Sequence, residues 1–591
     1  MNRSGNLLRK KFRQYLVPMI LASLASSLSE FLDGIVVSNL LGSDALALIN
    51  LGMPVVLIYA VVYSLIGIGG SSQYAVLLGE GNRPAARRVY SVSMYAMLGI
   101  GFLLLAAGIL SSGPLAGLLT DSPELSGPLA GFLRAQFLSA PIMIGTTGLT
   151  YFVTNDGHPN LSTVVFATAN ILNIIMDYVF ILVFHMGVEG TAYATATGYA
   201  AGLLIEVIVI HRTGHGTDPQ KAGTGSTGLK LTGIGMKDIR MLPGFCMRGI
   251  GSAFNQFGFV FRYVVINALA QALAGSMGLV LFSLCMQTFS FISLFVAGVV
   301  QTMIPIVAVL SGERDRKGIR FVLRQTNRYL VIFTVAALML FEAFPGLILR
   351  IYDITDARTA AEAIWAIRVF SLGYILRNIQ VSIMMYAQTI GEKKEPLLIS
   401  FMDAIVLGGV CWILGQFFGI RGIWIAFPVN SLLVMAVVLL YSWNRACKNG
   451  EAVQLYPLPA EDTGALFDVT IGHSRQEAVN ASREIISFAE KHGIPSKNAS
   501  IIDLAVEEMS VYTMEQWEAA RETGGIDILA SIQDHTVQIH FRSSGRPFSP
   551  TSFQGKNADP ADPIRVLMEV ADSMDYDCVL GMNSTRIRVC F

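Results

Sequence analysis

Long apolar segments, separated by short polar loops, fill the chain up to about residue 443. A helix crosses the hydrocarbon layer of a membrane with about 20 apolar residues, at about 1.5 Å of rise per residue. The pattern therefore predicts an all-α polytopic membrane protein with twelve transmembrane helices in two six-helix lobes. The predicted helices cover residues 15–40, 48–77, 88–113, 128–154, 161–184, 188–211, 241–270, 274–310, 322–347, 361–389, 396–418 and 421–443.

The loops between these helices alternate in charge. Basic residues gather before the first helix and in alternate loops, at 9–13, 83–88, 314–320 and 393–394. Because basic loops stay in the cytoplasm, the sequence predicts a multi-pass protein of the plasma (inner) membrane with both termini cytoplasmic. The long first apolar segment after a basic start indicates an uncleaved helix, since a signal peptide has a shorter apolar core.

Two polar stretches divide the chain into domains. Residues 213–238, rich in Gly and Thr, predict a flexible cytoplasmic linker between an N-terminal lobe (1–212) and a C-terminal lobe (239–445). The stretch LLGEGNRPAARR (77–88) resembles VLSGERDRKGIR (309–320), which indicates that the two lobes are repeats. Because six spans return the chain to the same side of the membrane, the repeats are parallel, with the transport path between them.

After a second linker at 446–466, the chain changes character. Residues 467–591 predict a soluble α+β domain, because amphipathic helices alternate there with short β-rich segments. The helices are predicted at 479–493, 498–520 and 563–574, and the strands around 526–533, 535–543, 576–580 and 585–591.

Composition agrees with a membrane protein and excludes other classes. The chain is 53% hydrophobic and 14% charged, against roughly 25% charged in soluble proteins. Lys+Arg and Asp+Glu are equal at 42 each, and no nucleic-acid partner is predicted. The six cysteines lack metal or disulfide spacing, and no P-loop motif occurs, so we predict neither an enzyme nor a nucleotide-driven pump.

Two carboxylates lie within the first predicted helix, Glu30 and Asp33. A charge at membrane depth costs at least about 2.5–3.5 kcal/mol, so such residues face a protein interior or a watery cavity. Their spacing of three places both on one helix face. The alternative is that one or both lie near the outer end and reach water.

A polar stripe follows the fifth predicted helix, formed by Asn170, Asn173 and Asp177. Counted from the outer helix ends, Asp33, Asp177 and Thr195 lie at a common depth of about 10 Å. Converging carboxyl, amide and hydroxyl oxygens suit a shared proton or a sodium ion. The alternative is separate polar residues that hydrogen-bond between helices.

The second lobe is predicted to be mostly apolar and aromatic. Its polar candidates are Asn255, Gln287 and Asp403, and we place Asp403 either in a cavity or near the cytoplasmic end. Together with Glu30 and Asn170, these three residues are candidates for substrate contact or proton relay.

The chain resembles the multidrug and toxic compound extrusion (MATE) family over about residues 10–445. The matching stretches are SEFLDGIVVSNLLGSDALALINLGMP, LLGEGNRPAARR, NDGHPNLSTVVFATANILNIIMDYVFI and GVEGTAYATATG. The resemblance implies a cation site at Asp33, Asn173, Asp177 and Thr195. It also implies a secondary active antiporter that exports drug-like, cationic amphiphilic compounds in exchange for H⁺ or Na⁺. Glu30 replaces an Asn found in many relatives, which leaves the coupling ion open.

Two other functions remain open. A lipid-linked saccharide flippase of the same superfamily would need a large cationic cavity for pyrophosphate, and the intramembrane carboxylates argue against it. A membrane-tethered regulatory protein would act through its C-terminal domain.

That domain resembles the GHKL ATPase fold in its anti-sigma-factor kinase branch, through LAVEEMSVYT, FRSSGRPFSP and GMNSTRIRV. Glu508 and Gly545 match the family motifs, but Tyr512 replaces the magnesium-binding Asn and Ser543 replaces the adenine-reading Asp. Prolines at 557–563 replace the Gly-rich phosphate loop. We therefore predict a degenerate domain without ATP or another cofactor, which regulates transport or binds a cytoplasmic protein partner.

Overall fold

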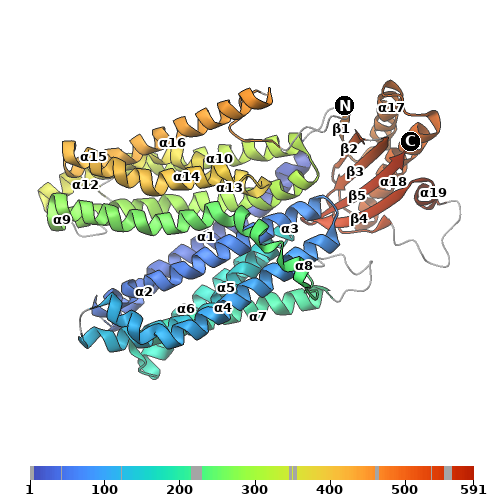
Figure 1. Cartoon of the computed structure of the whole chain (residues 1–591). Helices are drawn as coiled ribbons and strands as arrows, with labels where there is room; N and C mark the ends of the chain where they lie inside the picture. The colour runs from blue at the N-terminus through green and yellow to red at the C-terminus, as the bar shows by residue number, and fades with distance from the viewer. Residues whose placement is uncertain are drawn as a thin grey trace.

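The computed structural model describes residues 5–41, 43–120, 123–214, 229–344, 346, 349, 356–450, 452–458, 465–533, 535–550 and 562–591. Two bundles of long helices lie side by side and meet a sheet domain at one end (Figure 1). We call the bundle of residues 6–214 the N lobe, the bundle of residues 242–449 the C lobe, and the sheet domain of residues 466–591 the tail.

The N lobe is built from seven α-helices and two π-helical turns within the described residues. They are α1 (Asn6–Leu41), α2 (Ser43–Val62), η1 (Tyr63–Ile68), α3 (Gly69–Gly79), α4 (Arg83–Leu119), α5 (Pro123–Asn155), α6 (Pro159–Tyr178), η2 (Val179–Val183) and α7 (Gly187–Gly214).

A short helix and the C lobe follow. They comprise α8 (Met236–Ile239), α9 (Leu242–Gly312), α10 (Arg316–Ala343), α12 (Ala357–Leu372), α13 (Tyr374–Ile390), α14 (Lys394–Phe401), η3 (Met402–Val406), α15 (Leu407–Phe418) and α16 (Ile420–Asn449).

Ten helical stretches among the described residues are long and apolar enough to cross a membrane. The longest, Met236–Gly312, is 77 residues, and Gly275 inside it has φ 57° and ψ −137°, which breaks α9 into two arms. These arms correspond to the predicted helices at 241–270 and 274–310. The predicted total of twelve stays a prediction.

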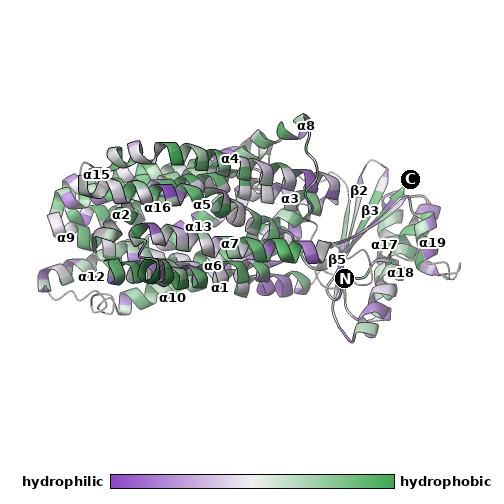
Figure 2. Ribbon diagram, turned by 90° about the horizontal axis from the view of Figure 1, so that it is seen from below, coloured by the Kyte–Doolittle hydropathy of each residue, from purple (hydrophilic) through white to green (hydrophobic). Residues whose placement is uncertain are grey.

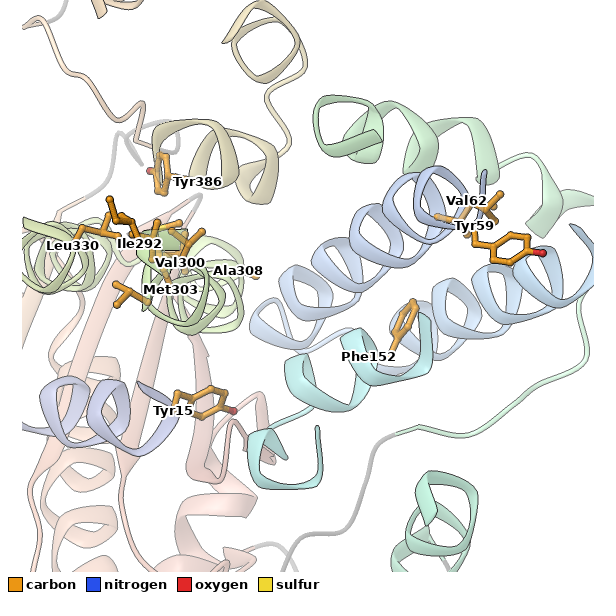
Figure 3. Close-up of a cluster of buried hydrophobic side chains, with 14 of the residues drawn as sticks. Tyr15, Tyr59, Val62, Phe152, Ile292, Val300, Met303, Ala308, Leu330 and Tyr386 are labelled. Atoms are coloured by element: carbon orange, nitrogen blue, oxygen red, sulfur yellow. The ribbon is translucent and has the colours of Figure 1, made fainter. Parts of the chain in front are cut away.

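Apolar residues predominate on the helices, and hydrophilic residues gather where the helices meet the tail (Figure 2). Buried apolar side chains of both lobes form one continuous cluster. Figure 3 shows part of it, with Phe152 from the N lobe and Met303 and Leu330 from the C lobe. The lobes are therefore packed against each other.

At the end next to the tail, the two lobes touch where two equivalent loops meet. A Cβ added at Gly79 would lie 2.1 Å from the Val309 carbonyl oxygen, and one at Gly312 would lie 2.0 Å from the Val76 carbonyl oxygen. The stretches VLLGE (76–80) and VLSGE (309–313) pair Val76 with Val309 and Gly79 with Gly312 when the repeat is aligned one residue further along, so the contact has an approximate twofold symmetry. Away from the tail the two bundles diverge (Figure 1).

The tail contains one antiparallel sheet in the order β1-β2-β3-β5-β4. Its elements are β1 (Leu466–Ile471), α17 (Arg475–Lys491), α18 (Ser496–Ala520), β2 (Ile526–Gln533), β3 (Thr536–Ser543), α19 (Pro563–Val570), β4 (Ser573–Val579) and β5 (Met582–Cys590). The helix predicted at 563–574 ends earlier, at Val570. The Asp572 amide donates instead to the Arg588 carbonyl (3.0 Å), so pairing with β5 stops the helix.

One face of this sheet packs against helices, and the other faces the lobes. Ile528, Ile539 and Ile587 lie in an apolar core with α17 and α18. The alternate residues His540 and Arg542 contact the C lobe. The period of two in β-strands thus gives the tail a helix-covered face and a polar face that meets the transporter.

Parts of both predicted linkers pack against the lobes. In the first, residues 215–228 lie outside the described part of the chain, and Thr232 hydrogen-bonds Ser91 of α4 (2.9 Å). In the second, α16 continues to Asn449 and the Tyr456 hydroxyl lies 2.7 Å from Asn327.

Candidate ion-coupling site and central cavity

Asp177 and Asp33 come together inside the N lobe, although 144 positions separate them in the chain. Asp177 is fully buried at the end of α6, and Asp33 of α1 lies within hydrogen-bonding range of it. Neither oxygen of Asp177 receives a hydrogen bond from any other described residue. Two neighbouring carboxyl groups in such surroundings can share one proton or bind a cation.

Asn173 lies one turn before Asp177 on the same face of α6 and is also buried. No described residue donates a hydrogen bond to its side-chain oxygen. Likewise, no described residue accepts a hydrogen bond from the side-chain nitrogen of Asn170. A Cβ at Gly198 of α7 would lie 3.3 Å from the backbone nitrogen of Asn173, so the backbones of α6 and α7 pack closely here.

Thr195 precedes Gly198 by three residues and therefore lies on the same face of α7, towards α6. Its hydroxyl donates to the Thr191 carbonyl (3.0 Å). Glu30 belongs to α1, but its side chain lies outside the described part of the structure. The oxygens available at this site are thus carboxyl, amide and hydroxyl, a set that suits H⁺ or Na⁺.

Sequence reasoning missed another buried carboxyl among the helices of the N lobe. Glu206 of α7 is fully buried, and the Thr150 hydroxyl of α5 donates to it (2.7 Å). The signal was visible as a single acidic residue in the apolar run LLIEVIVI.

A cavity of about 480 Å³ lies between the lobes. Ser23 and Ser26 of α1 line its N-lobe side, and Gln287, Phe289 and Ser293 of α9 line its C-lobe side. Gln287 is thus placed beside the central space, whereas Asn255 is half-buried on the first arm of α9. Hydroxyl, amide and aromatic groups of this kind can receive an amphiphilic ligand.

The C lobe holds charged groups that the sequence reasoning had not foreseen, because it described this lobe as mostly apolar and aromatic. Asp403 forms ion pairs with Arg262 (2.5 Å) and Arg377 (2.9 Å). Both arginines were visible in the sequence as isolated charges within apolar segments. Asp403 is therefore an ion-paired interior residue.

In the tail, aromatic rings stack at the positions that resemble a nucleotide site. Tyr512 packs on Phe548 (5.6 Å between ring centres), and Phe548 stacks on Tyr576 (6.1 Å). Burial raises the pKa of Tyr512 to about 12, so its hydroxyl stays protonated and cannot bind magnesium as an anion. Burial, followed by Glu507 and other nearby acids, also raises the pKa of Glu508.

The remaining positions of that site have other surroundings. Ser543 is buried in β3, opposite Asn583 of β5. Gly545 has φ 123°, and a Cβ there would lie 2.7 Å from a Glu522 oxygen. Most of the proline-bearing segment 557–563 lies outside the described residues.

Comparison with known proteins agrees with this architecture. The family model described as MatE matches residues 18–179 and 252–413, more than half of the chain. The multidrug export protein MepA of Staphylococcus aureus (strain MRSA252) is 23% identical over 435 residues, covering 73% of this chain and 93% of MepA. MepA of Staphylococcus saprophyticus is 24% identical over 434 residues, with the same coverage of 73% and 93%.

A solved structure, an outward-facing multidrug resistance transporter of the MATE family, shares the fold of the helical part. The TM-score is 0.66 at 20% identity, covering 76% of this chain and 100% of that structure. Both halves of the present chain match the same family model, which agrees with the predicted repeat.

Two lobes of membrane-crossing helices with a cavity between them define a multi-pass membrane transporter. The chain belongs to the MatE family. Proteins of this family are transporters for small drug-like molecules in lipid membranes, and they are not enzymes.

Proposed function

We propose that the helical part is a secondary antiporter that exports organic, cationic amphiphilic compounds in exchange for H⁺ or Na⁺. The observation that supports this is the pair Asp33 and Asp177: Asp177 is fully buried beside the half-buried Asp33, and both oxygens of Asp177 and one of Asp33 receive no hydrogen bond from other described residues. Two adjacent carboxylates at membrane depth are stable only with a proton or a cation between them. Binding and release of that ion can therefore be coupled to a change in conformation.

Transport in everted membrane vesicles tests this proposal. Dye export is driven first by a pH gradient alone and then by a sodium gradient alone, and one of the two should support it. Asp177→Asn should abolish gradient-driven export, whereas Asp238→Asn, on the short helix α8 outside both lobes, should leave it unchanged. Normal export by Asp177→Asn would remove the proposed site.

We further infer that the tail is a degenerate GHKL-like module in the cytoplasm that regulates transport by joining the lobes. On the C-lobe side, Arg542 donates to Glu313 (2.7 Å) and to Asp315 (2.5 Å), and all three side chains are at most 2% exposed. Burial alone disfavours the charged guanidinium, but Glu313 and Asp315 outweigh it and raise the pKa of Arg542. This pairing therefore persists at any physiological pH.

On the N-lobe side, the hairpin between β4 and β5 enters the apolar cluster of the membrane helices. Leu580 at its tip is 1% exposed and takes a left-handed φ of 54°, which a leucine rarely adopts. Beside it, Arg586 donates to the Gly79 carbonyl (2.9 Å), and Arg83 pairs with Asp577.

The tail thus contacts both loops that close the lobes against each other, through Gly79 on one side and Glu313 on the other. A rigid sheet bound to both lobes favours the conformation in which they touch at this end. The tail accordingly slows the change to the opposite conformation. An Arg542→Gln substitution detaches the tail from the C lobe and should therefore raise the export rate.

A further inference from the structure

Two arginines lie in the middle of the C lobe and share one carboxylate. Arg262 falls in the middle third of the first arm of α9, Arg377 in the middle third of the α12–α13 span, and Asp403 in the π-helical turn η3. Both arginines donate to the same oxygen, Asp403 Oδ2, at 2.5 and 2.9 Å. Single π-helical turns often occur at functional sites.

The three side chains carry one excess positive charge. A neutral buried pair would need only one arginine, since charges in protein interiors are normally compensated. Among the described residues, Asp403 is the one carboxylate in contact with either guanidinium. The excess charge is therefore balanced by something other than the described side chains.

A phenol beside the arginines also lacks a partner. Tyr374 is 3% exposed, and its hydroxyl has no hydrogen-bond partner among the described residues. The electrostatic environment of that hydroxyl includes both Arg262 and Arg377. Two guanidinium groups and a phenol hydroxyl together form a donor set for an organic carboxylate.

The donor set is connected to the central cavity through Phe289. The guanidinium carbon of Arg377 lies 4.7 Å from the centre of the Phe289 ring, and Tyr374 stacks on that ring at 5.8 Å. Phe289 in turn lines the cavity of about 480 Å³. The side chains of Arg377 and Asp403 keep 14% and 17% exposure, so the cluster is not sealed.

We propose that Arg377, with Arg262 behind it, binds a carboxylate group of the exported compound. This site rests on the proposed export function and narrows its substrates from cationic amphiphiles in general to those that also carry a carboxylate, which are zwitterions. In a zwitterion, the cationic group would face the acidic N lobe while the carboxylate faces the arginines. Asp403 holds both guanidinium groups in place and competes with the ligand for them.

The test compares two dyes that differ in a single group, a rhodamine with a free benzoate and its methyl ester. Binding to the full chain in detergent is followed by fluorescence anisotropy, without any ion gradient. The benzoate should bind roughly tenfold more tightly than the ester, the gain expected from a charge-assisted hydrogen bond. Arg377→Gln, which leaves a neutral Arg262–Asp403 pair, should reduce this preference to about twofold or less.

Other variants keep the test decisive. Asp403→Asn should increase the preference for the benzoate, because it removes the competing carboxylate. Arg421→Gln is the matched control, since Arg421 pairs with Glu362 at an exposed site, and it should bind like the wild type. Unchanged ester binding shows that a variant is folded.

Three results would overturn the proposal: equal binding of both dyes by the wild type, an undiminished preference in Arg377→Gln, or displacement by inorganic pyrophosphate but not by benzoate. The last would assign the site to a phosphate group. Because no gradient is used, failure of antiport and failure of this site are distinguishable.

Discussion

Buried charges of opposite sign distinguish the two lobes at the scale of single residues. The N lobe encloses Asp177 and Glu206 beside the half-buried Asp33, whereas the C lobe holds Arg262 and Arg377 around one Asp403, apart from the pair of Glu395 with Arg445. Each ionised group in such surroundings needs a counter-charge, because desolvation costs several kcal/mol per ion. In the functions proposed above, the acidic pair of the N lobe takes the coupling cation and the two arginines of the C lobe take the carboxylate of a substrate.

A buried lysine at the tail contact gives a pH-dependent prediction. Burial lowers the pKa of Lys11 from 10.5 to about 8, and its ammonium lies 3.4 Å from the Gly581 carbonyl. Between these two pKa values the unfolded chain binds more protons than the folded one, so stability rises with pH in this window. At neutral pH the folded protein therefore keeps a poorly solvated charge.

We expect Lys11→Met to stabilise the folded protein most at neutral pH, because there it removes that charge. Its stability relative to the wild type should fall by about 1–3 kcal/mol between about pH 7 and about pH 10. Thermal unfolding of the full chain in detergent measures this, with Lys237→Met, at an exposed position of α8, as the control. A pH-independent difference between variant and wild type would show that Lys11 does not titrate in this way.

At the scale of elements, the ends of α3 and α9 cross through glycines. Each glycine faces a backbone carbonyl of the other helix end, with no room for a side chain. Backbone atoms cannot move aside as a flexible side chain can. The contact therefore requires glycine on both helices, and the sequence repeat supplies it twice.

Gly79→Ala should weaken the contact between the lobes by about 1–3 kcal/mol, the typical cost of overpacking. Gly312→Ala should act alike, because it meets the equivalent carbonyl. Spin labels on the loops after Gly79 and Gly312 would report a larger separation of the lobes. Gly99→Ala in α4, where a Cβ meets nothing within 4 Å, is the control. An unchanged separation in Gly79→Ala would contradict this role.

At the scale of the whole molecule, the tail is a cross-brace between the two lobes. Its polar sheet face holds the C lobe through Arg542, and its hairpin enters the N lobe at Leu580. Since the two contacts lie on different strands of one sheet, motion of one lobe away from the other must break at least one of them.

Breaking either contact should have the same effect on transport. Arg542→Gln leaves Glu313 and Asp315 without their guanidinium, and Leu580→Asp places a charge in an apolar site, each at a cost of about 3–5 kcal/mol. Both should raise the initial rate of dye export by about two- to tenfold, measured per molecule of protein in vesicles. Arg546→Gln, which disturbs an exposed pair with Glu522 within the tail, is the matched control. Slower or unchanged export in both variants would contradict the proposal that the tail holds the two lobes together.

The sequence by itself determined the class of the protein and most of its elements. Apolar length specifies helices for a bilayer, and strand alternation specifies the tail, because both depend on local periodicity. It also selected Asp33, Asn173 and Asp177, since isolated polar residues in apolar helices are conspicuous. The role of these residues in ion coupling stays a prediction.

Only the tertiary structure decided which distant groups meet. Arg262, Arg377 and Asp403 come from three separate helices, and their shared charge follows from packing that no local pattern records. The same holds for the docking of Arg542 on Glu313 and Asp315, which are 227 or more positions away in the chain. The helix predicted at 563–574 was too long for the same reason: the hydrogen bond from Asp572 to β5 that ends it depends on a distant segment of the chain. Local sequence sets the propensity of each segment, while pairing energies between segments determine where charges are compensated and where elements end.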